Sequence, residues 1–235
     1  MPWLAPGENQ QLETASLASR ILCERHNNAL SPLDSAALRT FTQMQAAFAY
    51  ATQRSLHKHP RFCLIDGDAF EKWSIKTALG LYHARIAAEP RGRIRDLYEL
   101  DADAARSLLA DSPLPAPFCI YAHMEKPGPI KHGRIAFAPL VSEPVARFCA
   151  MSAHLGGASF HIPFDRSITP EDHFETDGYR PWAIDYVGVQ RTARIIVSWT
   201  ENRLRHKMVS YHFTKASTWA RPLTRLHALR KDSIS

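Results

Sequence analysis

The hydrophobic pattern of this 235-residue chain changes its period near residue 112, and that change constrains the fold most. Before it, apolar residues recur every three or four positions, as in amphipathic helices. After it, apolar and polar residues alternate in short runs separated by glycine and proline, as in half-buried antiparallel strands. We therefore expect an α+β protein with a mainly helical part, residues 1–112, packed on an antiparallel sheet or sandwich formed by residues 113–235. The two parts could also form one composite domain.

A first long helix is predicted by a capping pattern. Ser31, Pro32 and Asp34 follow the order of an N-cap, a first helical residue and an acidic third residue. The apolar spacing then continues to about Ser55. The pattern therefore predicts a helix that begins after Ser31.

A second long helix is predicted from Asp68 to about Ala88. Asp68 and Glu71 have the spacing of a capping box, and Lys72 stands four positions after Asp68, where the two charges can pair. Apolar residues occupy two faces of this helix, which indicates a central, buried element. A shorter helix is expected at 101–110.

Several strands and one hairpin are predicted in the second part. Gly156 and Gly157 stand where a two-residue hairpin turn belongs. Residues 142–154 fit either a strand or a short helix. The alternating runs are 118–122, 135–137, 160–164, 195–199 and 209–213.

The segment around Cys23 and His26 contains the most distinctive motif. Two residues lie between Cys23 and His26 in the sequence, which is a normal spacing for half of a zinc site. Asn27 follows His26 directly. The segment resembles the second half of the zinc-knuckle, treble-clef HNH endonucleases. The resemblance implies zinc binding and contact with nucleic acid. The family's first zinc pair and catalytic histidine would lie upstream, but residues 1–22 contain neither Cys nor His, so a degenerate, inactive relative is expected.

Further zinc ligands could come from the segment between the two long helices. His57, His59 and Cys63, together with Cys23 and His26, could supply the four donors of a zinc site. The alternative is that Cys23 is a buried thiol, that residues 26–28 form a polar loop, and that the 56–63 segment is a solvated loop. On that interpretation no cofactor is expected.

The positive charge of the chain is concentrated at its C-terminal end. Residues 200–235 contain eight basic and two acidic residues, which equals the net charge of +6 for the whole chain. Such an asymmetry is typical of a phosphate-binding surface, although a solvated basic tail has the same composition. The candidate nucleic-acid-binding residues are Arg203, Arg205, Lys207, Arg221, Arg225 and Lys231.

These patterns favour a nucleic-acid-associated protein that resembles a degenerate HNH nuclease. The alternative is a protein-interaction or small-ligand-binding module without a nucleic-acid role. Whether the chain is an enzyme stays open, because it contains no P-loop, dinucleotide fingerprint, Gly-x-Ser-x-Gly or His-Glu-x-x-His motif. The chain contains no long apolar run, and its four cysteines are widely spaced, so we expect a cytoplasmic protein that contacts no membrane. The expected partners are nucleic acid, another protein or a second copy of the chain.

Overall fold

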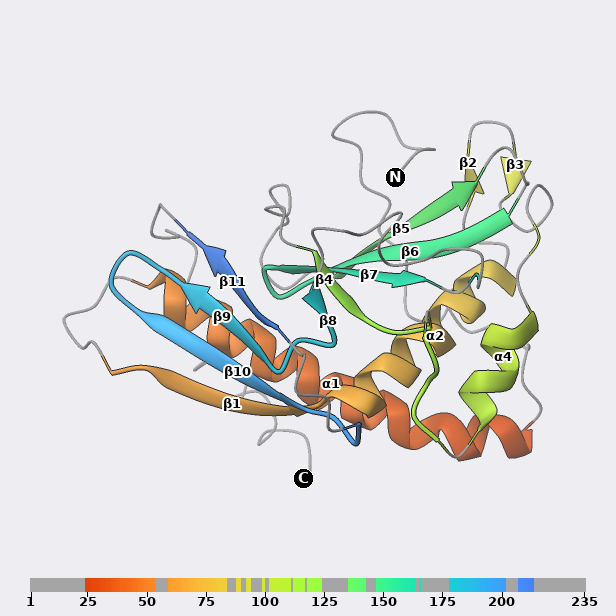
Figure 1. Ribbon diagram of the computed structural model, residues 1–235, viewed down its shortest axis with the longest axis horizontal. Helices are drawn as coiled ribbons and strands as arrows, with labels where there is room; N and C mark the ends of the chain where they lie inside the picture. The colour runs from red at the N-terminus through yellow and green to blue at the C-terminus, as the bar shows by residue number, and fades with distance from the viewer. Residues whose placement is uncertain are drawn as a thin grey trace, which may run out of the picture.

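The computed structural model describes residues 24–53, 59–83, 88–89, 92–93, 99, 102–110, 112–116, 118–123, 135–142, 147–163, 165, 178–201 and 207–213. Within these residues, three helices and two larger sheets form the α+β fold expected from the sequence (Figure 1). The helices are α1 (Glu24–Thr52), α2 (Gly67–His83) and α4 (Ala102–Leu109). The strands are β1 (Arg61–Asp66), β2 (Ala88–Glu89), β3 (Gly92–Arg93), β4 (Tyr121–His123), β5 (Ile135–Ser142), β6 (Arg147–Leu155), β7 (Ala158–Pro163), β8 (Gly178–Tyr179), β9 (Ala183–Val187), β10 (Thr192–Ser198) and β11 (Met208–His212).

The four-stranded sheet has the order β1-β10-β9-β11 and is mixed. β10 and β9 are antiparallel, whereas β1 pairs in parallel with β10 and β11 pairs in parallel with β9. Alternate residues of β10, from Ala193 through Ile195 to Val197, are buried against α1. The expected antiparallel pairing therefore holds only for β9 and β10 in this sheet, because both edge strands, β1 from the helical half of the chain and β11, pair in parallel.

The five-stranded sheet has the order β5-β6-β7-β4-β8 and is antiparallel, as predicted. Gly156 and Gly157 form the turn between β6 and β7, also as predicted, with φ values of 50° and 84°. A side chain at Gly157 would collide with the ring of Phe48 on α1, so glycine is required both for the turn and for close packing. The open choice for residues 142–154 is resolved in favour of a strand over 147–154, which belong to β6, while 143–146 lie outside the described residues.

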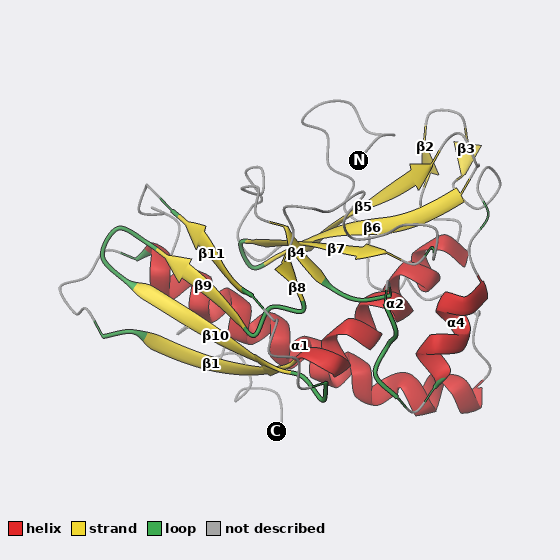
Figure 2. Ribbon diagram, in the orientation of Figure 1, coloured by secondary structure: helices red, strands yellow, loops and turns green. Residues whose placement is uncertain are grey.

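Helix α2 is sandwiched between α1 and the five-stranded sheet. Phe70 packs edge-on against Phe160 of β7, with ring centroids 5.6 Å apart, and Tyr82 stacks on Phe148 of β6. Trp73 lies between α1 and this sheet, 4.9 Å from the ring of Phe41 in α1 and 6.3 Å from the ring of Phe137 in β5. Figure 2 shows α2 and α4 together at one end of the molecule, while α1 continues along the four-stranded sheet. The predicted central position of this helix is confirmed.

Helix α1 begins earlier than the capping pattern predicts. It starts at Glu24, and Ser31 and Pro32 lie inside it, so the predicted cap at Ser31 is wrong. Leu30, in the turn before the proline, is buried in the core, and Lys76 of α2 donates a hydrogen bond to its carbonyl. These contacts hold the helix together through Pro32, which is exposed, so solvent can reach the carbonyl that lacks an amide partner.

The predicted capping box of α2 is also wrong. Asp66, the last residue of β1, is the cap, because its Oδ1 accepts a hydrogen bond from the Ala69 amide at 3.0 Å. Asp68 accepts from the Thr200 amide instead of pairing with Lys72, whose Nζ donates to a carbonyl near α4. Helix α2 is described as far as His83, and Ala88, the predicted end of the helix, belongs to strand β2.

The remaining predicted strands differ mainly in their limits. Residues 118–122 are all buried, and only β4 within that run is a strand. The segment expected to be a solvated loop ends in β1, whose Cys63 and Ile65 are buried. No helix in the described part of the chain is long and apolar enough to cross a membrane.

Candidate functional site

A buried ion pair joins α2 to the loop that follows β8. Arg180 Nη2 lies 2.7 Å from Glu71 Oε2, and Arg180 Nε donates to Glu71 Oε1 at 3.2 Å. Both side chains are only 1% exposed. A charged pair this deep is tolerated only when its other polar atoms are also paired, because both charges have lost their hydration.

The other polar atoms of this pair form hydrogen bonds with two further segments. The Ile120 amide donates to Glu71 Oε1 at 2.7 Å. Arg180 Nη2 donates to the Leu114 carbonyl, and Arg180 Nη1 donates to Glu201 Oε2, both at 2.6 Å. A single guanidinium therefore connects α2, the segment before β4, and the loop after β10. We call Glu71, Arg180 and Glu201 the carboxylate–arginine network.

The backbone of Arg180 is strained. Its φ of 38° lies in the left-handed region, which costs a non-glycine residue roughly 1–3 kcal/mol. The Arg180 amide donates to the Ile120 carbonyl, and its guanidinium lies 5.6 Å from the Tyr179 ring and 5.5 Å from the Trp199 ring. Glycine would relieve the strain but would remove the guanidinium on which the network depends.

Burial dominates the protonation of the network. It raises the pKa of the Glu71 carboxyl from 4.5 to about 7, while the hydrogen bonds and positive charge of Arg180 act in the opposite direction. Burial by itself would lower the pKa of Arg180, but Glu71 raises it above its ordinary value. Glu71 accepts three hydrogen bonds, as an ionised carboxylate does, and the guanidinium stays charged.

Cys119 and Tyr179 lie beside this network. The Cys119 thiol donates to the Tyr179 hydroxyl at 3.8 Å. Burial, and next the nearby Glu71 carboxylate, raises the pKa of Cys119 to about 12. The pKa of Tyr179 is also raised, chiefly by burial. A thiol that stays protonated is a poor nucleophile, so this geometry does not favour covalent catalysis by Cys119.

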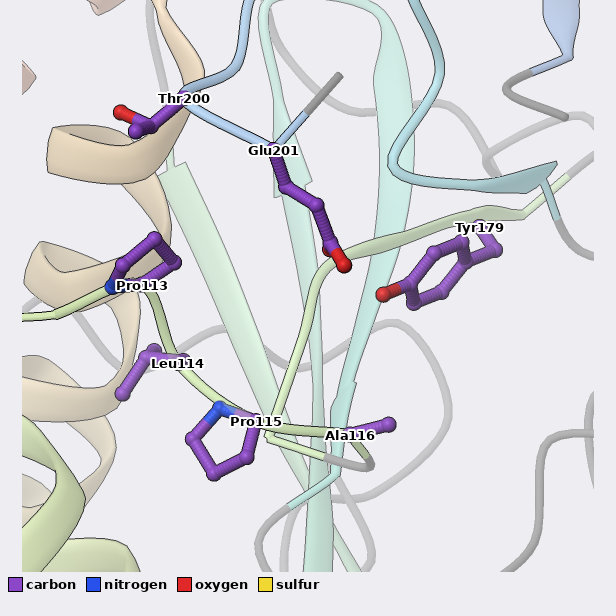
Figure 3. Close-up of a pocket in the computed structure, with 7 residues that line it drawn as sticks. All are labelled: Pro113, Leu114, Pro115, Ala116, Tyr179, Thr200 and Glu201. Carbon is purple, nitrogen blue, oxygen red and sulfur yellow. The ribbon is translucent and has the colours of Figure 1, made fainter. Parts of the chain in front are cut away.

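A pocket of about 310 Å³ opens in front of the network (Figure 3). The Glu201 carboxylate and the Tyr179 hydroxyl point toward one another across it. The segment before β4 forms the facing wall, and Thr200 lies beside Glu201. The lining residues are Pro113, Leu114, Pro115, Ala116, Tyr179, Thr200 and Glu201.

Of the five predicted zinc ligands, the structure describes the side chains of His59 and Cys63. Cys23 and His57 lie outside the described residues, and His26 lies in the first turn of α1. Cys63 is buried on the side of β1 that faces α1, whereas His59 is exposed before the strand. Within the described ranges, no three His, Cys, Asp or Glu side chains are grouped so that they could hold a metal ion.

Of the six candidate nucleic-acid-binding residues in the basic segment, the structure describes one. Lys207 is exposed, and its carbonyl accepts a hydrogen bond from the Trp182 amide just before β11. The other five candidates lie outside the described residues: Arg203, Arg205, Arg221, Arg225 and Lys231.

Sequence reasoning missed a polar face on the five-stranded sheet. His123 of β4 stacks on His161 of β7, with ring centroids 4.3 Å apart. His154 of β6 lies on the same face, and its Nδ1 is 2.7 Å from Ser159 Oγ. Burial, and next the charges of the other two histidines, lowers the pKa of His154. Ser159 is fully buried, so this serine–histidine contact presents no accessible nucleophile.

The pocket residues were also missed. The sequence places Arg180 between Tyr179 and Pro181, just before a strand, but local pattern does not reveal its partner on α2. Arginine surrounded by aromatic residues and proline is a weak indication of a buried guanidinium. Glu71 stands three positions after Asp68, which is the spacing of a capping box, so the sequence predicted a capping role instead of a buried ion pair.

Comparisons with known proteins give no relative for this arrangement, because no protein-family model, curated protein or solved structure matches the chain.

Proposed function

We propose that the protein is a small-ligand-binding module and that the pocket in front of the carboxylate–arginine network is its binding site. One observation carries the proposal. Arg180 bonds to both walls of the pocket, to the Leu114 carbonyl on one side and to Glu201 on the other. A pocket whose walls are fixed in this way loses little conformational entropy when a ligand enters, which favours binding.

Binding is favoured over catalysis by the state of the nearby side chains. Cys119 is buried and its pKa is raised to about 12, and Glu71 and Arg180 are out of reach of solvent. Among the described lining residues, no serine, cysteine or histidine stands beside a general base. The walls combine apolar contact surface with a few polar groups, which is the usual composition of a ligand site.

The test is a titration of isotope-labelled protein with three probes of equal size: n-butylamine, n-butanol and butyrate. We expect at least one probe to shift the backbone amide signals of Tyr179, Thr200 and Glu201. The variant Ala116→Trp fills the pocket and should abolish the shifts. Ala110→Trp, an exposed site outside the lining, should leave them unchanged. If none of the three probes shifts these signals, the proposal is wrong.

A second function is favoured by the charge asymmetry alone. Residues 200–235 carry the full net charge of +6, which supports binding to nucleic-acid phosphates independently of the pocket. We therefore retain nucleic-acid association through Arg203, Arg205 and Lys207 as a separate proposal. The relation to HNH nucleases, based on about 15 residues, stays a prediction.

A further inference from the structure

The charge of the pocket walls indicates which ligands can bind. Glu201 is an acidic lining residue whose side chain is 26% exposed. Among the described residues, the lining contains no lysine, arginine or histidine. An anionic ligand would therefore meet a carboxylate, and the described part of the walls offers it no cationic side chain.

Arg180 does not reverse this preference, although it lies directly behind the pocket. Its side chain is 1% exposed, and its Nε, Nη1 and Nη2 atoms all donate to protein acceptors. The carboxylate–arginine network has no net positive charge, because its charge is −1 when both carboxylates are ionised and zero when Glu71 is protonated. The guanidinium orients Glu201 rather than offering its charge to a ligand.

A further carboxylate lies on the same side of the pocket. Asp68 at the start of α2 accepts a hydrogen bond from the Thr200 amide at 2.6 Å, so its charge lies close to the Thr200–Glu201 wall. This bond also occupies the amide of Thr200, which would otherwise be available to an anion. Among the described residues, the Thr200–Glu201 wall of the pocket therefore carries negative charge.

The facing wall has few hydrogen-bond donors, because two of its four residues are prolines. Pro113 and Pro115 have no amide hydrogen, so they offer apolar ring surface and carbonyl acceptors. The Leu114 side chain is buried beneath them. Such a wall suits an aliphatic stem that ends in a donor group, and the volume of about 310 Å³ admits a small molecule or one side chain.

Resting on the proposed function, we infer that the ligand presents an alkylammonium or alkylguanidinium cation whose charged end pairs with Glu201 and whose stem lies on the proline wall. Both a free amine and a lysine side chain of a peptide carry this chemistry. A neutral alcohol of the same length can make the apolar contacts but not the ion pair.

The three-probe titration decides the ligand class separately from the existence of the site. We expect n-butylamine to bind at least about tenfold more tightly than n-butanol, and butyrate to bind more weakly than both. Butylamine affinity should fall with added salt, whereas butanol affinity should not, because only the ion pair is screened. If butanol or butyrate binds as tightly as butylamine, the inference fails while the pocket proposal stands.

The variant Glu201→Gln tests the assigned partner. Glutamine keeps an acceptor for Arg180, so the fold should be retained, which thermal melting can check. Its butylamine affinity should drop about tenfold while its butanol affinity is unchanged. Glu99→Gln removes an exposed negative charge outside the lining and should have no effect. Unchanged butylamine binding by Glu201→Gln would overturn the inference.

A final arm distinguishes the two sources of the cation. N-acetyl-lysine N-methylamide carries the butylammonium group on a peptide backbone. Binding at least as tight as that of n-butylamine assigns the site to a lysine side chain of a protein partner. Weaker binding assigns it to a free amine, and both results retain the cation class.

Discussion

Glu71 and Arg180 are 109 positions apart in the chain, yet two hydrogen bonds join their side chains inside the core. The value of such a pair to the fold depends on what replaces it. Removing one partner leaves an uncompensated buried charge, whereas apolar residues in place of both need no partner.

We expect Glu71→Ala to lower the free energy of unfolding by about 3–5 kcal/mol, because Arg180 would stay buried with one carboxylate fewer. Chemical denaturation measures this change. The double variant Glu71→Leu with Arg180→Met should be less destabilised than the sum of the single variants. Additive losses would show that the two side chains are not coupled.

The surface pair of Lys76 and Asp34 provides the matched control. Its N–O distance is also 2.7 Å, but the Asp34 side chain is 57% exposed. Asp34→Ala should therefore cost no more than about 1 kcal/mol.

Acid should weaken the fold through His154. Burial holds the pKa of His154 below its ordinary 6.5, so the unfolded chain takes up a proton at this position before the folded chain does. This contribution to stability is complete above pH 6.5 and is lost as the pH falls. In His154→Gln, the slope of the unfolding free energy against pH should be smaller in this range, and the decrease should correspond to the uptake of at most one proton.

Glu71 acts in the opposite direction over a neighbouring range. Because its pKa is raised from 4.5 to about 7, its contribution is fully present below pH 4.5 and is lost as the pH rises through 7. The difference between the wild type and His154→Gln must therefore be measured, rather than the wild-type slope alone. Identical slopes would contradict the assignment to His154.

Trp73→Ala should destabilise the protein by about 3 kcal/mol, because this side chain contacts aromatic rings of α1, α2 and β5. Thermal and chemical unfolding measure the loss. Trp182 is 42% exposed, so Trp182→Ala should have a smaller effect. A melting temperature for Trp73→Ala close to that of the wild type would exclude the structural role.

Chelation should leave the melting curve of the purified protein unchanged. Cys63 lies against α1, and His59 is exposed, so these two predicted ligands do not form a metal-binding pair. Elemental analysis provides the direct measurement. One zinc ion per chain that is lost in Cys23→Ser, together with stability, would instead support the treble-clef interpretation.

Neutralising Arg203, Arg205 and Lys207 together should weaken binding to duplex and single-stranded DNA alike. The slope of log affinity against log salt should fall by roughly two to three, since each phosphate contact contributes about 0.7–0.9. Fluorescence anisotropy at several salt concentrations measures both quantities. An equivalent loss in a variant that neutralises the exposed Arg39, Arg61 and Arg106 would show that only total charge matters.

Features encoded by neighbouring residues were predicted from the sequence. The Gly156–Gly157 hairpin and the strands β10 and β11 follow from local alternation and turn chemistry. The α+β class followed from the change of period. These features depend on contacts within a few positions along the chain.

Features that depend on distant partners were not predicted. β1 has only six residues, and its partner β10 lies in the other half of the chain, so no local alternation reveals the parallel pairing. Ser31 has the right residues around it for a cap, but burial of Leu30 extends α1 past it. The pocket depends on Arg180 and Glu71 together, and neither position alone indicates the other.

The parallel pairing of β1 with β10 determines when the protein can complete its fold during synthesis. Arg61 pairs with Ala193, so the four-stranded sheet cannot form until most of the chain has left the ribosome. Until then, the face of α1 that packs on this sheet remains uncovered. Contacts between such distant residues slow folding, because a long loop must close first. Nascent chains that stop before β10 should therefore expose apolar surface and be bound by chaperones.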